Sequence, residues 1–201
     1  MPTERLEAFS DGVFAVAITL LVLDLQPPIT NHSLVQGLAD RWPSFAAFGL
    51  SFVIIGIIWV NHHAVFSTLR SIDRPLLFIN LALLLSVVLI PFATSLFARY
   101  VTAGGDNSHV AAAVFSGSSL LMSLCFNAVY VWIAQHPELR HDTAAQSWSV
   151  RSVVRFGLGG AVYAGGVAIA FVSAPLVFVM SALIAAYYVV DQATSPAPAG
   201  G

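Results

Sequence analysis

The sequence predicts an all-α membrane protein with six transmembrane helices per subunit. Of its 201 residues, 58% are hydrophobic and only 9% are charged, whereas about a quarter of the residues of a soluble domain are charged. The apolar runs are each close to the roughly 20 residues that a bilayer requires. Pro residues and short polar runs separate them. The predicted spans are residues 6–25, 43–69, 75–100, 110–134, 150–172 and 175–190.

Proline marks the limits of the first three spans. Pro27 and Pro28 end the first. Pro43 and Pro75 begin the second and third, because proline is favoured in the first turn of a helix. Pro91 lies inside the third span and predicts a kink there.

The later spans are limited in the same way. The dipeptide His136-Pro137 ends the fourth span, and a tight hairpin at residues 173–175 joins the fifth to the sixth. Residues 1–191 are therefore predicted to form a single transmembrane domain. Residues 192–201 have too little to bury and are expected to be a disordered C-terminal tail.

The basic residues, which are all Arg, predict the orientation. With six spans, six of them fall on one side and two on the other, and the positive-inside rule then places both termini in the cytoplasm. The expected location is a cell membrane, which the chain crosses several times. The six are Arg5, Arg70, Arg74, Arg140, Arg151 and Arg155, and the two are Arg41 and Arg99.

Several functions are excluded or disfavoured. A net charge of −2 offers no basic patch for nucleic acid. His62 and His63 are adjacent, so their side chains diverge on a helix, whereas helical zinc pairs need a spacing of four. The loop that holds His136 and His141 is expected to be solvated rather than to bind a metal. No nucleophile-plus-base spacing indicates an enzyme, and no cofactor is expected.

The first span carries polar residues at its inner end, in the pattern Arg5-x-x-x-Phe9-Ser10-Asp11. Charge in a spanning helix costs at least about 2.5 kcal/mol at mid-bilayer, so partners are needed. Donors at the same depth lie in the second and third spans. We interpret the set as polar contacts that position the first helix, with a titratable lock through His as the alternative. The expected partners are Trp59, Asn61, His62, His63 and Asn80.

A stripe runs along the same helix. At 100° per residue, Thr19, Leu20 and Leu23 lie within about 60° of Val16. Arg5, Phe9 and Gly12 share this face. From periodicity alone, the stripe fits an ordinary lipid-facing or core surface.

The run Arg5-x-x-x-Phe9-Ser10-Asp11-Gly-Val-Phe-Ala-Val-Ala-Ile-Thr-Leu-Leu-Val-Leu, followed by Trp59-x-x-His62-His63, resembles bacterial members of the transmembrane-protein-175 family, the family of the lysosomal potassium channel. The resemblance implies a homotetramer of six-helix subunits in the bacterial plasma membrane, with a central pore that the first helices line. It places the hydrophobic constriction on Val16, Leu20 and Leu23, with Thr19 as a hydroxyl layer. It makes Arg5, Phe9, Ser10, Asp11, Trp59, His62, His63 and Asn80 the interhelical network.

The expected function is therefore a potassium-permeable cation channel. The sequence has no Thr-Val-Gly-Tyr-Gly filter, so preference for K⁺ over Na⁺ should be weak and should come from partial dehydration. Asp24, repeated around the outer mouth, would concentrate cations. The alternative is a proton-coupled secondary transporter that uses Asp11 and His62 or His63, although neither a broken helix nor an internal repeat is visible.

Overall fold

The computed structural model describes residues 3–29, 33–141 and 150–194. All of the secondary-structure elements in this part of the chain are helices. In chain order they are α1 (Thr3–Leu20), the 3₁₀ turn η1 (Leu21–Asp24), α2 (Leu34–Asp40), α3 (Trp42–Phe66), α4 (Arg74–Tyr100), α5 (Gly105–Gln135), the 3₁₀ turn η2 (Pro137–Leu139), α6 (Val150–Ala170) and α7 (Ala174–Thr194).

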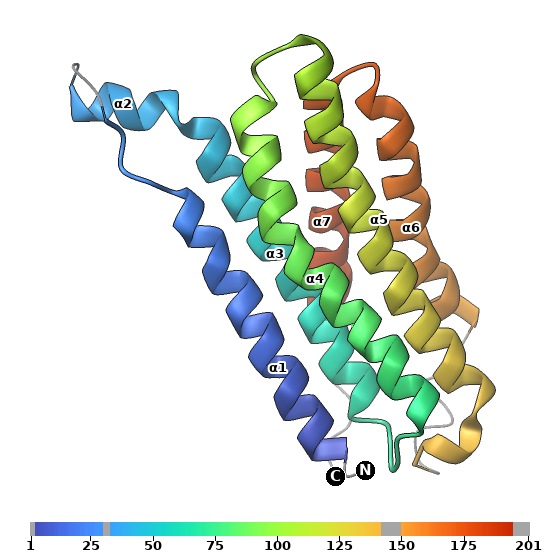
Figure 1. Cartoon of the computed structure of the whole chain (residues 1–201). Helices are drawn as coiled ribbons and strands as arrows, with labels where there is room; N and C mark the ends of the chain where they lie inside the picture. Colours follow the sequence, from blue (N-terminus) through green and yellow to red (C-terminus); the bar gives the residue numbers. More distant parts are fainter. Residues whose placement is uncertain (1–2, 30–32, 142–149, 195–201) are drawn as a thin grey trace.

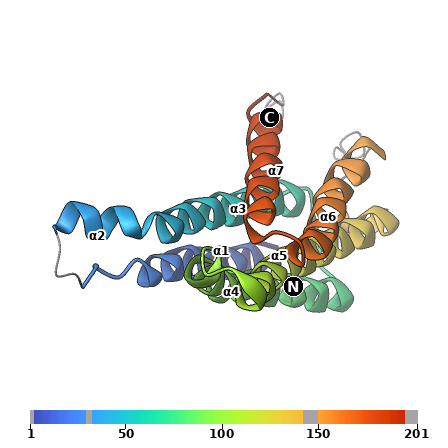
Figure 2. The same cartoon turned by 90° about the horizontal axis from the view of Figure 1, so that it is seen from above.

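The long helices form one bundle (Figure 1). Helix α5 packs against α4 and α6, and α1 packs on α3 and α4. Helix α1 begins and α7 ends at the same end of the bundle, which we call the inner end. The opposite, outer end holds Asp24, the short helix α2 and the start of α3. Helix α2 projects sideways from the bundle, and α6 and α7 diverge from their outer hairpin (Figures 1 and 2).

The predicted all-α membrane class is confirmed. Within the described residues, five helices are long and apolar enough to cross a membrane, and residues Gly157–Ala170 of α6 form a shorter apolar helix. Some boundaries differ from the prediction. The fourth long helix begins at Gly105 rather than near residue 110, and α7 continues to Thr194. The rest of the predicted tail, residues 195–201, lies outside the described part. Helix α2 was not among the predicted spans.

Local chemistry explains where the helices begin. The Asp73 side chain accepts a hydrogen bond of 3.0 Å from the backbone N–H of Leu76 and so caps α4, with Pro75 in the first turn. Gly104 and Gly105 have φ values of 69° and 63°, in the left-handed region that glycine enters without steric cost. They allow the tight turn that places α5 antiparallel to α4.

The inner loops are tied together across the bundle. Leu69 and Arg140 form an isolated antiparallel β-bridge between the α3–α4 loop and the segment after α5. The Arg70 guanidinium adds a 2.8 Å bond from Nε to the Glu138 carbonyl. Trp132 of α5 donates from Nε1 to the second carboxylate oxygen of Asp73 at 3.1 Å. The start of α4 is thus bound to the end of α5.

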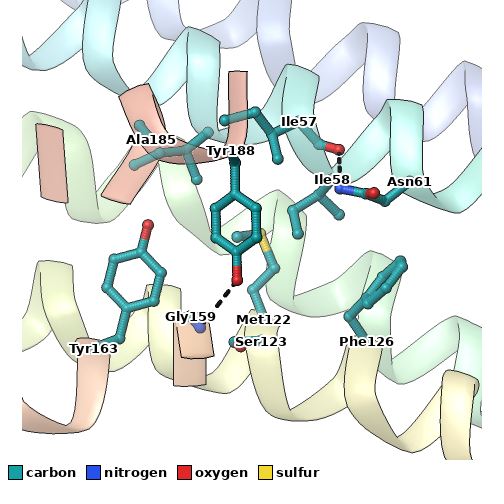
Figure 3. Close-up of a pocket in the computed structure, with 11 residues that line it drawn as sticks. Ile57, Ile58, Asn61, Met122, Ser123, Phe126, Gly159, Tyr163, Ala185 and Tyr188 are labelled. Atoms are coloured by element: carbon teal, nitrogen blue, oxygen red, sulfur yellow. Dashed lines mark hydrogen bonds between the residues drawn. The ribbon is translucent and has the colours of Figure 1, made fainter. Parts of the chain in front are cut away.

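A small cavity of about 40 Å³ lies between α3, α5, α6 and α7 (Figure 3). Its walls are mainly apolar, with Ile58, Met122 and Phe126 among them. Gly159 donates its backbone N–H to the Tyr188 hydroxyl at 3.0 Å on one wall. This cavity is on the side of α3 that faces away from α1.

Candidate functional site

One face of α1 is left exposed by the bundle. The exposed fractions are 53% for Phe9, 56% for Val16 and 38% for Leu20, and the face continues in the η1 turn with Leu23, which is 65% exposed. On the opposite face Leu6, Ser10, Phe14 and Ala17 are buried against the other helices. The predicted stripe therefore lies on the uncovered surface of the chain, and Thr19 and Gly12 lie on it as well.

The Thr19 hydroxyl on this face has a fixed direction. It donates its proton to the Val16 carbonyl at 2.9 Å. A hydroxyl carries one proton and two acceptor lone pairs. With its proton bound to the backbone, the exposed oxygen can present its lone pairs to a cation.

A buried chain of hydrogen bonds joins α1, α4 and α3. The Asn80 amide donates from Nδ2 to the Ser10 hydroxyl at 3.1 Å, and its carbonyl lies 2.9 Å from Nε2 of His62. Because a carbonyl oxygen can only accept, His62 donates from Nε2. All three side chains are at most 1% exposed. Phe66 stacks on the His62 imidazole with the ring centres 4.0 Å apart.

A second pair lies nearer the surface. Trp59 donates from Nε1 to Oδ1 of Asp11 at 2.9 Å, and its ring stacks with that of His63. Asn61, the other expected donor, bonds instead to the Ile57 carbonyl of its own helix at 2.8 Å. Asp11 thus bonds directly to α3, whereas Ser10 is linked to α3 only through Asn80 of α4.

The structure divides the predicted interhelical network into two clusters. One cluster holds Ser10, Asn80 and His62, and the other holds Asp11, Trp59 and His63. Within the described residues, no hydrogen bond joins Asp11 to His62 or His63, the residues of the alternative proton relay. Arg5 is exposed and has no side-chain partner in that same part of the chain. Phe9 lies on the open face of α1 rather than between helices.

The outer end of α1 has its own polar group. Ser95 of α4 donates to Oδ1 of Asp24 at 2.7 Å, and Arg41 donates from Nη1 to the Gln26 carbonyl at 2.6 Å. These residues line a cavity of about 310 Å³ together with Ser44, Ala98 and Arg99. Asp24 therefore shares this cavity with Arg41 and Arg99, which was not predicted from the sequence of the first helix.

Among the described residues, no three His, Cys, Asp or Glu side chains lie close enough together to hold a metal ion. His136 bonds through Nδ1 to the Trp132 carbonyl, at 2.9 Å, and stacks on the Trp132 indole. The loop that holds His136 and His141 continues into residues 142–149, which lie outside the described part of the chain.

The apolar helices and their packing define a multi-pass integral membrane protein. A family model described as "Endosomal/lysosomal potassium channel TMEM175" matches residues 5–91. A potassium channel of Streptomyces collinus is 43% identical over 195 residues, which cover 96% of this chain and 94% of that protein. A potassium channel of Chamaesiphon minutus is 37% identical over 196 residues, covering 92% of this chain and 93% of that protein.

The fold agrees with these similarities. The crystal structure of a lysosomal potassium-selective channel TMEM175 homolog from Chamaesiphon minutus superimposes with a TM-score of 0.83 at 33% identity, covering 96% of this chain and 98% of that one. The chain belongs to the TMEM175 family, which confirms the resemblance found in the sequence. The family is one of ion channels, not of enzymes.

Proposed function

We propose that the chain is one subunit of a potassium-permeable cation channel, in which the α1 helices of four copies line a central pore. The observation that carries this proposal is the exposed apolar face of α1, where Val16 and Leu23 are more than half exposed although the other face of the helix is held by α3 and α4. The names of the bacterial relatives and of the similar crystal structure support the choice of potassium.

In this pore the constriction is formed by Val16, Leu20 and Leu23. Aliphatic side chains offer no ligands to an ion, so they block flow by dewetting and require partial dehydration when open. The oxygen of Thr19 is the one side-chain ligand beside them. K⁺ loses its water more readily than Na⁺, so the pore prefers K⁺, and the preference is weak because a single hydroxyl layer replaces little of the hydration shell.

The same proposal includes the topology. Helix α6, which runs for 21 residues from Val150, is the sixth span alongside the five longer or more apolar helices. The inner end of the bundle then faces the cytoplasm of a bacterial cell, because Arg5, Arg70, Arg74 and Arg140 gather there.

Potassium and sodium flux through purified protein in liposomes tests the function. Leu23→Ala should increase cation flux several-fold, because the constriction widens when four large side chains are removed. The control is Leu183→Ala on α7, which removes an equally exposed leucine (66%) far from α1. Wild-type liposomes without K⁺ flux, or equal effects of the two substitutions, would argue against a pore on α1. The mass of the protein in detergent independently tests for four subunits.

A further inference from the structure

The two arginines of the outer end converge on one cavity. Arg41 precedes α3 and Arg99 is in the last turn of α4, yet both line the cavity of about 310 Å³. The other polar residues that line it are Asp24, Gln26, Ser44 and Ser95. The lining therefore carries two positive charges and one negative charge.

Hydrogen-bond donors exceed acceptors in this cavity. Arg41 uses one N–H on the Gln26 carbonyl, and Ser95 occupies one oxygen of Asp24. In the part of the chain that the structure describes, neither guanidinium forms an ion pair, and Arg99 has no side-chain partner at all. Each guanidinium has five N–H donors, so most of the ten are free to bind a ligand.

We propose that this cavity binds a phosphate group, either inorganic phosphate or the monoester headgroup of a lipid such as phosphatidic acid. A guanidinium matches the oxygens of phosphate with two parallel, charge-assisted hydrogen bonds. The cavity is large enough for a tetrahedral oxyanion. Hydrogen phosphate also keeps a proton, which it can donate to the free oxygen of Asp24, whereas sulfate at neutral pH has none to donate.

The proposal deepens the proposed function and rests on it for its effect on flux. Asp24 ends the η1 turn that extends α1, so the cavity lies beside the outer end of the pore-lining helix. Two nearby arginines repel cations there. A bound phosphate reverses the local charge and raises the cation concentration at the mouth.

Binding is measured first, without reference to transport. Purified protein is titrated at pH 7 with potassium phosphate, sulfate or chloride at equal ionic strength, and thermal stability and calorimetric heat are recorded. Phosphate should bind more tightly than sulfate. Arg99→Gln should weaken phosphate binding about tenfold or more, and Asp24→Asn should remove the preference for phosphate. The control is Arg74→Gln, at the other end of α4, which should leave binding unchanged.

The two sources of phosphate are distinguished with lipid. If short-chain phosphatidic acid raises thermal stability in an Arg99-dependent way but inorganic phosphate does not, the headgroup is the ligand, and the reverse result identifies the free ion. Either result supports the site. The absence of binding by either compound would overturn the site. Binding of equal strength in Arg99→Gln and Arg74→Gln would also overturn it. If inorganic phosphate binds, sulfate that binds as tightly would overturn it as well.

Flux then tests the consequence. In liposomes at low ionic strength, where the Debye length is about 30 Å, occupancy of the site should raise K⁺ flux about twofold or more in wild type and not in Arg99→Gln. Flux that is equal with and without ligand would overturn the effect on conduction while leaving the channel proposal intact. Absence of K⁺ flux under every condition would count against the channel itself, and the binding data would still decide the site.

Discussion

The indole of Trp59 donates a 2.9 Å hydrogen bond to the Asp11 carboxylate, and this bond links the first helix to the third at the edge of the bundle. Ser10, the preceding residue, reaches α4 through Asn80 instead. Adjacent residues on α1 therefore fix the helix from two directions. This arrangement determines which way the opposite face of α1 points.

Replacing Trp59 with Phe should destabilise the protein by about 1–2 kcal/mol, because a hydrogen bond to a charged group is lost while the aromatic ring remains. The measurement is thermal unfolding of the detergent-solubilised protein. Trp42→Phe is the control, since Trp42 is 57% exposed and its indole has no hydrogen-bond partner among the described residues. Equal losses for the two substitutions would mean that the Asp11 bond adds nothing.

Asn80→Ala should cost more stability than Ser10→Ala. Asn80 is completely buried, and its removal leaves both His62 and Ser10 without their partner, at about 1–3 kcal/mol, whereas Ser10→Ala frees only one amide N–H, at about 0.5–1.5 kcal/mol. Unfolding of both single variants and of the double variant checks the order. The double variant should lose less than the sum of the two, and strict additivity would show that the three side chains do not act as one chain.

Thr19→Val should lower the K⁺/Na⁺ permeability ratio towards one, because it removes the exposed oxygen while keeping the shape of the side chain. Thr19→Ser retains the hydroxyl and should retain the ratio. Reversal potentials or paired ion fluxes in liposomes give the ratio. Stability should change by less than about 0.5 kcal/mol in either case, since the side chain is on the exposed face. An unchanged ratio in Thr19→Val would remove Thr19 from the selectivity argument.

Gly166→Ala should destabilise the bundle by about 1–3 kcal/mol, because the added methyl group would clash with the Ser116 hydroxyl of α5. That hydroxyl donates to the Tyr163 carbonyl at 3.0 Å, so it cannot move without losing a bond. At the preceding residue, the methyl group added by Gly165→Ala has no neighbouring atom within 4 Å, so this substitution should be neutral or stabilising. Adding Ser116→Ala to Gly166→Ala should recover part of the loss. A lack of rescue would assign the damage to another cause.

The sequence was sufficient for features that depend on one helix at a time. Apolar length predicts the five long apolar helices. The angle between residues predicts that Phe9, Val16, Leu20 and Leu23 share one face, and the structure leaves that face exposed. The same angle turns Ser10 away from the side of the helix that carries Phe9 and Val16.

Features that depend on two helices meeting could not be predicted in this way. Nothing local to Asp24 indicates that Ser95, 71 positions later, donates to it. Arg41 and Arg99 share a side of the membrane by simple counting, but their convergence on one cavity depends on how α3 and α4 cross. Helix α2 is too short, at seven residues, to give a clear apolar period.

The bridge between Leu69 and Arg140 ties the inner loops of the bundle together. It binds the base of α4 to α5, and the Ser10 and Asp11 contacts bind α1 to the same region. At the outer end α1 continues into the η1 turn, which Ser95 of α4 holds through Asp24, and α2 extends away from the other helices. If α1 tilted about its Ser10 and Asp11 contacts, Leu23 would move farther than Val16, because it lies farther from those contacts along the helix.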